Sequence, residues 1–414
     1  MSGPTSHHYL VALADGGGTV PAELGVVRRL VERGHRVTAL VDESMAGPSR
    51  ATGATVHLWS APRGTDFRDW AIRNPLELAK SMSEHYLSGP AAGHAADTLA
   101  DLDAALPDRV VATFFTLGAM IAAEARGVPF DVLMPNIYIA PVRGRPVGGA
   151  GLSPMRGPIG AMRDRMAGAA TTRLLDRYAL ATLNAVRATH GLAPVEHVWE
   201  QVHHARRELV LTTAEFDFDG DFPPNVRFVG PILDDPDWAA RTSFDPPAGD
   251  GPLVLVALSS TFQNHADCLQ RIADALARLP VRGLVTTGPA IPPELIETSE
   301  NVVVVASAPH RAAMRRASLV VTHGGHGTVM KSLAAGVPLV VLHHGRDQAD
   351  NAVRVVRHGA GVAVPRRAPS DDIAAAIERV LGNARYREAA ARLGAAINRD
   401  VSGSALLDEL EPAH

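Results

Sequence analysis

The stretch THGGHGTVMKSLAAGVP, Thr322–Pro338, combines residue types that can do chemistry. It places four glycines and two histidines between an apolar, β-branched run and a helical pattern. A helix that begins directly after a glycine turn presents backbone N–H groups and the positive end of its dipole. Glycines let a phosphate approach the backbone closely, and His323 and Thr328 can add side-chain donors. These residues therefore predict an anion site that a diphosphate would fit.

Three other uses of this loop fit the sequence less well. A Walker A loop needs Gly before Lys-Ser, but Met330 precedes Lys331. No third glycine completes a dinucleotide fingerprint here, and in DGGGTVP that position is Pro21. His323 and His326 have a spacing that could bind a metal, but no carboxylate or thiolate in the same loop completes the shell. We therefore expect no metal and no nicotinamide cofactor.

Two α/β halves must position these residues. In the first half, YLVALA, a helical stretch and HRVTALVD form a strand–helix–strand unit, and RVVATFF, LGAMIAAEARG and VPFDVLMP repeat it. After Leu253, apolar β-branched runs alternate with helical stretches such as CLQRIADALARL. The pattern predicts two doubly wound, Rossmann-like parallel-sheet domains that face a cleft. Ligands of such sheets bind at the carboxyl ends of the strands, where the glycine loops fall.

Composition marks the domain boundaries. Residues 231–250 are rich in Pro, Asp and Gly with little periodicity, which indicates an interdomain linker. We therefore assign residues 1–230 and 251–395 to the two domains, and residues 396–414 to a C-terminal helix that could cross back to the first. Residues 141–166 are dense in Gly, Pro, Arg and Met. They fit a long excursion over a site and a surface loop equally well.

Overall composition excludes several classes of function. A net charge of -4 with 46% hydrophobic residues describes a globular protein without general attraction to nucleic acid or anionic lipid. The single Cys268 cannot form an internal disulfide or a thiolate zinc site, and suits a small buried position. The sequence lacks a signal-peptide pattern and any apolar run near the roughly 20 residues that span a bilayer. We expect a soluble, cytoplasmic protein with no nucleic-acid or membrane partner, and a homodimer stays open.

A second motif completes the pattern around the glycine loop. GRDQADN, which contains Asp347 and Gln348, lies a short strand and loop after HGGHGT and GVP. In this order and spacing the motifs resemble the donor-binding region of GT-B fold nucleotide-diphosphosugar glycosyltransferases. The resemblance is closest to bacterial members that decorate polyketides and other natural products, in the family that also contains the plant and animal UDP-glycosyltransferases. It is strong from about Leu253 to Val364 and looser across the first half.

The resemblance implies roles for particular residues. The N-terminal domain would bind the acceptor and the C-terminal domain the nucleotide sugar, without a metal. The residues that would touch the diphosphate are His323, Gly325, Gly327, Thr328, Ser260 and Thr261. Asp347 and Gln348 would form hydrogen bonds with the sugar hydroxyls. Asp347 also suits the start of the helix that follows it, whatever it binds.

The nucleoside end departs from the family pattern. SAPH, residues 307–310, matches the stretch in which a backbone, here at Ala308, contacts the base and a Gln reaches the ribose. In this chain that Gln is His310. Ser307 stands where many members carry an aromatic residue, and Lys331 stands where many carry a ribose-binding Glu. The resemblance therefore leaves UDP-sugars and dTDP-sugars both open as donors.

The catalytic base is the second departure. Inverting transfer needs a base for the acceptor, which in this family is usually a His in a turn after the first strand, oriented by an Asp. This chain has Gly18 at the His position and Thr113 at the Asp position. Three explanations remain: Asp15 is the base, the acceptor is acidic enough to need little help, or the chain binds nucleotide sugar without turnover. Asp15 precedes glycines and also suits a turn former.

Other residues give weaker indications. A hydroxyl such as that of Thr19 suits positioning better than proton abstraction. Three further histidines could reach the cleft, although nothing in their spacing indicates it: His85, His94 and His265. Residues 77–99 and 155–166 offer Met, Tyr, His and Leu, which suit a bulky apolar acceptor or the core equally well.

Together these patterns predict an inverting GT-B glycosyltransferase. It would move a sugar from a UDP- or dTDP-sugar to a hydrophobic natural-product acceptor, either a polyketide or an aromatic aglycone. Two alternatives remain. The missing dyad suggests a catalytically weak nucleotide-sugar-binding partner of another transferase. A sugar epimerase of the same fold would release product without an acceptor.

Overall fold

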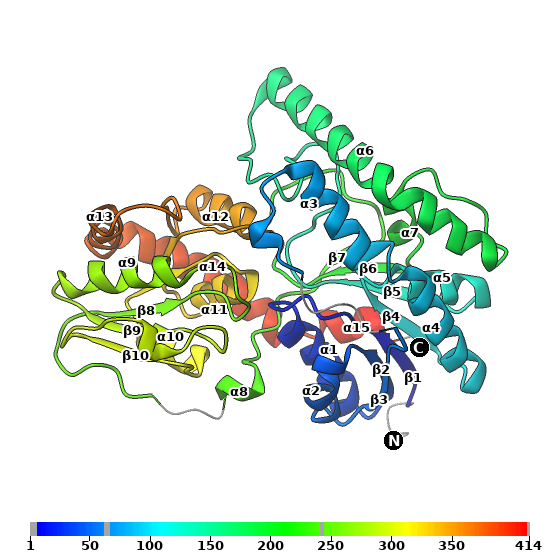
Figure 1. The fold of residues 1–414 in the computed structure, drawn as a ribbon, viewed down its shortest axis with the longest axis horizontal. Helices are drawn as coiled ribbons and strands as arrows, with labels where there is room; N and C mark the ends of the chain where they lie inside the picture. The colour runs from blue at the N-terminus through cyan, green and yellow to red at the C-terminus, as the bar shows by residue number, and fades with distance from the viewer. Residues whose placement is uncertain (1–5, 62–66, 241–243, 412–414) are drawn as a thin grey trace.

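Two parallel sheets form the two halves of the molecule (Figure 1). The computed structural model describes residues 6–61, 67–240 and 244–411. The first sheet has seven strands in the order β3-β2-β1-β4-β5-β6-β7. These strands are β1 (His8–Ala12), β2 (Arg36–Val41), β3 (Thr55–Leu58), β4 (Arg109–Thr113), β5 (Phe130–Met134), β6 (Arg207–Val210) and β7 (Val226–Phe228). The strands pair in parallel because a helical crossover separates most of them along the chain.

The second sheet has six strands in the order β10-β9-β8-β11-β12-β13. They are β8 (Leu253–Ala257), β9 (Arg282–Thr286), β10 (Val302–Val305), β11 (Leu319–Thr322), β12 (Leu339–Val341) and β13 (Gly361–Ala363). The chain order reverses between β1 and β4 in one sheet and between β8 and β11 in the other. Such a switch point opens a crevice at the carboxyl ends of the strands, where ligands bind.

Helices cover both sheets. Those of the first half are α1 (Val20–Glu32), α2 (Ala46–Arg50), α3 (Pro75–Met82), α4 (Ala91–Ala104), α5 (Leu117–Arg126), α6 (Gly157–Thr189) and α7 (Val198–His203). Those of the second half are α9 (Ala266–Ala277), α10 (His310–Arg316), α11 (His326–Ala334), α12 (Gln348–Arg357), α13 (Ser370–Leu381) and α14 (Ala384–Ser402). The last helix, α15 (Ala405–Leu410), lies with the first half. Short turns are η1 (Glu43–Met45), η2 (Asp69–Ala71), η3 (Ser83–Leu87), η4 (Pro293–Leu295) and α8 (Asp237–Ala240).

The prediction of one irregular segment over residues 141–166 is wrong for its second half. Residues 157–166 form the first turns of α6, the long helix at the top of Figure 1. Pro158 lies in the first turn, where a missing backbone N–H costs nothing. The Ala, Met and Arg residues that follow are good helix formers. The Gly and Pro residues near position 157 therefore belong to the start of α6 and not to a loop.

The C-terminal boundary also differs from the expectation. Helix α14 runs without interruption through residue 395, so the boundary assigned there lies inside a helix. Helix α15 then packs Leu406 and Leu410 into the core of the first half, and the Tyr9 hydroxyl donates to the Leu410 carbonyl at 3.2 Å. The chain therefore crosses back. The expected linker, residues 231–250, carries α8, but its residues 241–243 lie outside the described residues, as do 1–5, 62–66 and 412–414.

Buried charges fix how the halves meet. The Asp217 carboxylate pairs with Arg145 at 2.8 Å and with Arg354 of α12 at 2.6 Å. Burial alone would raise the pKa of Asp217, but the two guanidinium groups hold it below its ordinary value. The Asp350 carboxylate accepts from the backbone N–H of Gly149 at 2.5 Å and of Gly151 at 2.9 Å. The segment before α6 is thereby pinned to α12.

Candidate active site

The glycine turn after β11 has the backbone that a phosphate loop requires. Helix α11 begins at His326, and Gly325 is its N-terminal cap residue. Gly324 adopts φ 91°, a conformation that side chains disfavour. A Cβ at Gly324 would lie 2.8 Å from Val341 Cγ1 and 3.0 Å from the Gln348 carbonyl oxygen. The turn therefore packs against the loop that follows β12, which links the predicted phosphate and sugar sites.

The His323 ring packs against this turn. It is buried, and a Cβ at Gly325 would lie 2.5 Å from His323 Nε2, so only glycine fits there. Burial, together with the neighbouring His344 and His265, lowers the pKa of His323 to about 3. The ring is therefore neutral at pH 7 and can donate through one nitrogen only.

Residues from β8 reach the same edge of the sheet. Ser260 is exposed and Thr261 half-buried, and the Ser259 and Thr261 hydroxyls lie 3.0 Å apart. A Cβ at Gly17 in the first half would lie 2.7 Å from Thr261 Cγ2. The β8 loop therefore touches the N-terminal glycine turn directly. Gly327 and Thr328, in the first turn of α11, are half-buried on the same side of the sheet.

The two predicted sugar residues have different surroundings. Asp347 is half-buried, and its Oδ2 accepts from Asn351 Nδ2 at 3.0 Å. Burial raises the pKa of Asp347, while His326 opposes the shift. Gln348 is buried, accepts from the His344 N–H at 2.7 Å and donates to Gln263 Oε1 at 3.0 Å. Gln348 thus holds the loop in place, and Asp347 keeps part of its surface exposed.

We expect Asp347→Ala to weaken sugar discrimination more than affinity for free nucleoside diphosphate, because its predicted partner is the hexose. Calorimetry should show a loss of at least about 10-fold for the nucleotide sugar, the scale of one hydrogen bond to a charged group. The loss for the nucleoside diphosphate alone should be less than about threefold. Asn351→Ala removes the amide that donates to both Asp347 and the Gly324 carbonyl, so it should weaken both ligands and reports the effect of loosening the two loops together. Equal losses for both ligands in Asp347→Ala would move Asp347 out of the sugar pocket.

At the nucleoside end the structure shows an ion pair that the sequence did not indicate. Lys331 Nζ lies 2.8 Å from Asp235 Oδ1, and both side chains are only 8% exposed. Asp235 comes from the predicted linker and also accepts from the Arg311 N–H at 3.2 Å. The nearby His310 Nε2 lies 3.3 Å from Thr286 Oγ1, and burial, with Lys331, lowers its pKa to about 4. A buried Lys requires a nearby negative charge, but the sequence does not show that Asp235 supplies it.

The position at which the family usually carries its histidine base has no side chain in this chain, because it is Gly18. Gly18 is exposed, and no described heavy atom lies within 4 Å of where its Cβ would stand. Thr113 is fully buried at the end of β4. Asp15 Oδ1 accepts from the Gly17 N–H at 2.8 Å, and Oδ2 accepts from the Ser44 hydroxyl at 2.6 Å. This geometry favours the turn-forming role of Asp15, and its role as a base stays a prediction.

The three further histidines lie beside aromatic rings or in the other half. The His94 ring is tilted by 34° against Trp59 with ring centroids 4.1 Å apart, and His85 stacks on Phe67 at 4.7 Å. His265 is buried in the other half, where its Nδ1 accepts from the Gln263 N–H at 3.2 Å. That bond places the ring proton of neutral His265 on Nε2. Burial lowers its pKa to about 4, so it joins His323 as a neutral ring below the donor loops.

His326 is committed to the domain contact. Its Nε2 lies 3.2 Å from the Leu211 carbonyl and its Nδ1 3.5 Å from Asn351 Oδ1.

Within residues 6–61, 67–240 and 244–411, no group of three or more His, Cys, Asp or Glu is placed to hold a metal ion. Cys268 is buried and unpaired with another cysteine, as expected. Among the described helices, none combines the length and apolar character needed to cross a bilayer.

Aromatic rings gather beside the N-terminal glycine turn. Phe115 lies 5.1 Å from Tyr86 between ring centroids, and its Cε2 would stand 3.1 Å from a Cβ at Gly16. Tyr86 in turn meets Phe67 at 5.4 Å. Trp70 of η2 meets Phe262 of the other half edge-on at 5.3 Å. Several aromatic rings therefore lie close to the glycine turn that contains Gly18.

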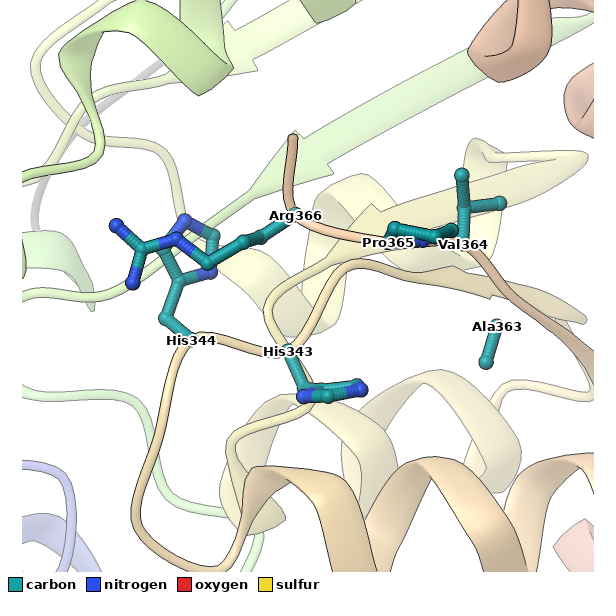
Figure 2. Close-up of a pocket in the computed structure, with 6 residues that line it drawn as sticks. All are labelled: His343, His344, Ala363, Val364, Pro365 and Arg366. Atoms are coloured by element: carbon teal, nitrogen blue, oxygen red, sulfur yellow. The ribbon is translucent and has the colours of Figure 1, made fainter. Parts of the chain in front are cut away.

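A pocket of about 550 Å³ opens where β12 and β13 end (Figure 2). Its lining residues are His343, His344, Ala363, Val364, Pro365 and Arg366. Burial lowers the pKa of His344 to about 4, and Arg366 adds to the shift. The His344 Nδ1 lies 2.7 Å from the Leu342 carbonyl. The pocket thus borders the loop that carries Asp347.

Comparisons agree with this arrangement. Residues 183–403 match the family model described as UDP-glucoronosyl and UDP-glucosyl transferase. The chain is 32% identical over 409 residues to 4'-demethylrebeccamycin synthase of Lentzea aerocolonigenes, covering 93% of this chain and 94% of that protein. The solved structure of the glycotransferase of kitacinnamycin has a TM-score of 0.76 at 23% identity and covers 98% of both chains. Spinosyn rhamnosyltransferase complexed with thymidine diphosphate has a TM-score of 0.67 at 19% identity, covering 98% of this chain and 100% of that one. The predicted GT-B fold class is confirmed.

Proposed function

The chain belongs to the UDP-glucoronosyl and UDP-glucosyl transferase family, and we propose that it moves a sugar, with inversion, from a nucleoside diphosphate to a hydrophobic natural-product acceptor. One observation carries this proposal. The glycine turn of α11 packs through Gly324 against the loop of Asp347, while Thr261 touches the N-terminal turn. These contacts support the proposal that the residues for diphosphate, sugar and acceptor would lie together at the carboxyl ends of the strands.

The donor would lie along the carboxyl edge of the second sheet. The first turn of α11, with Thr261 and His323, would hold the diphosphate, because backbone N–H groups and the helix dipole favour an anion. This field would also stabilise the charge that grows on the leaving diphosphate, so we propose that no divalent ion is needed. Thymidine diphosphate in the similar spinosyn rhamnosyltransferase supports a dTDP-sugar, and the family description supports a UDP-sugar.

The acceptor would bind against the first half. The rings of Phe115, Tyr86 and Phe67 offer flat apolar surface beside the glycine turn. An aromatic or polyketide aglycone fits this surface. The products named for the similar proteins, 4'-demethylrebeccamycin and kitacinnamycin, support a natural-product acceptor.

Acceptor-dependent release of nucleoside diphosphate tests the proposal. The purified chain, with dTDP-glucose or UDP-glucose and a panel of flat aromatic alcohols, phenols and acids, should release nucleoside diphosphate only when an acceptor is present. The release should persist in excess EDTA. Binding of donor without release would favour a nucleotide-sugar-binding partner, which the absent dyad at Gly18 and Thr113 suggests. Release without acceptor would favour the epimerase, and loss in EDTA that magnesium restores would overturn metal independence.

A further inference from the structure

Arg346 occupies an unusual position between the two halves. It directly precedes Asp347 in the loop after β12 and adopts φ 55°, a left-handed conformation uncommon for a side-chain-bearing residue. Such conformations cluster at functional sites. Its side chain is 27% exposed, and its Nε donates to Asp69 Oδ2 of η2 at 2.7 Å. A cation of the donor domain is therefore anchored by a carboxylate of the acceptor domain.

The guanidinium group points at the N-terminal glycine turn. Arg346 Nη1 would lie 3.6 Å from a Cβ at Gly17, the residue next to the open Gly18 position. Burial alone would lower the pKa of Arg346, but Asp69 raises it, and Tyr86 and Asp347 act in the same direction. The group thus stays charged. A fixed cation stands beside the place where relatives carry a base, next to the predicted sugar contact.

Resting on the proposed transfer activity, we propose that Arg346 binds the acceptor through an ionised oxygen, so that the natural acceptor is a carboxylic acid or an acidic phenol. The anionic oxygen attacks the anomeric carbon and forms the new C–O bond. The C–O bond to the diphosphate breaks, and its electron pair leaves with the diphosphate beside α11. No proton has to be removed in this step, so the absence of a histidine at position 18 is no obstacle.

Asp69 is a positioning residue in this arrangement. Its carboxylate holds Nε, and the Nη1 edge of the guanidinium faces the glycine turn. A planar guanidinium fixed at one edge can offer parallel N–H donors to an oxyanion at another. The aromatic rings of Phe115 and Tyr86 would hold the body of the same acceptor.

Calorimetry in saturating dTDP tests the binding step without turnover. Wild type should bind 2-naphthoate at least about 10-fold more tightly than 2-naphthalenemethanol, as expected for a close charge pair. Arg346→Gln should abolish this preference, and Arg346→Lys should keep part of it. The matched control is Arg126→Gln, whose partner is the exposed Asp103, and it should keep the full preference. Equal affinities in wild type, or a preference that survives Arg346→Gln in protein that still binds dTDP, would overturn the proposal.

Turnover separates this proposal from the transfer activity on which it rests. With phenols of graded acidity, the wild-type rate should follow the fraction of phenolate across pH. Asp69→Asn gives the contrary outcome. If this variant lost turnover of every acceptor but kept the preference for 2-naphthoate, Asp69 would be a base, and the proposed role of Arg346 in catalysis would be overturned. A preference for 2-naphthoate with no release from any acceptor would refute the transferase function and leave the oxyanion site standing.

Discussion

Gly324→Ala is expected to remove donor binding almost completely. At φ 91° any side chain strains the backbone, and the new Cβ would meet Val341 and the Gln348 carbonyl at 2.8 and 3.0 Å. Both contacts are with packed groups that cannot move without displacing the phosphate turn or the sugar loop. We expect affinity for dTDP and UDP to fall by about 100-fold or more, the scale observed when positioned oxyanion donors are lost. Isothermal calorimetry measures this directly.

Gly47→Ala provides the control. It lies in α2 of the first half, and no heavy atom of the described chain lies within 4 Å of its added Cβ. Alanine is favoured over glycine inside a helix, so the fold should be unharmed and affinity should change by less than about fivefold. If folded Gly324→Ala bound both nucleotides like wild type, the turn of α11 would not be the diphosphate site.

Gly18→His should create activity toward neutral acceptors. The position is exposed, its backbone is not left-handed, and its added Cβ meets no described heavy atom within 4 Å. The ring would stand beside Gly17, which faces Thr261 and Arg346 of the other half. A positioned base contributes about 100-fold or more, and without an Asp partner we expect a gain of at least about 10-fold for an aromatic alcohol. The gain should appear as pH rises through the histidine pKa.

Thr113 is best left unchanged in this experiment, because it is fully buried and a carboxylate there would lie unpaired in the core. Gly47→His is the matched control, since that glycine is also exposed with open space around it but lies in α2. It should leave turnover unchanged. An unchanged rate in Gly18→His, with dTDP binding intact, would show that position 18 does not reach the acceptor oxygen.

Local patterns made most of the fold predictable. Strands such as β8 and β11 are buried on both faces, so their sequences are continuous apolar runs with β-branched residues. Gly336, which follows the end of α11, adopts φ 68°, a conformation that glycine commonly supplies after a helix. The sequence did not show the start of α6, because a Pro close to glycines, as at Pro158, is common both in the first turn of a helix and in a loop.

Contacts between distant segments made the rest unpredictable. Lys331 and Asp235 are 96 residues apart, and Arg346 and Asp69 are 277 apart. The sequence around each residue of these pairs does not indicate which residue it contacts. The same holds for Gln348, whose amide is engaged with Gln263 rather than turned outward. The motifs indicate which loops could form the site, and only the packing of the two halves shows which side chains those loops bring into contact.

The return of α15 to the first half sets an order of assembly during synthesis. Leu406 and Leu410 complete a core that otherwise consists of early residues such as Tyr9, Leu24 and Leu30. The second sheet and its helices come from one continuous span of chain, so they can fold as soon as they emerge from the ribosome. The first domain, although made earlier, lacks the apolar contacts of Leu406 and Leu410 until residues 405–410 arrive. We therefore expect the early part of the nascent chain to depend longest on chaperone protection, and truncation before α15 to favour aggregation through the apolar residues that α15 covers.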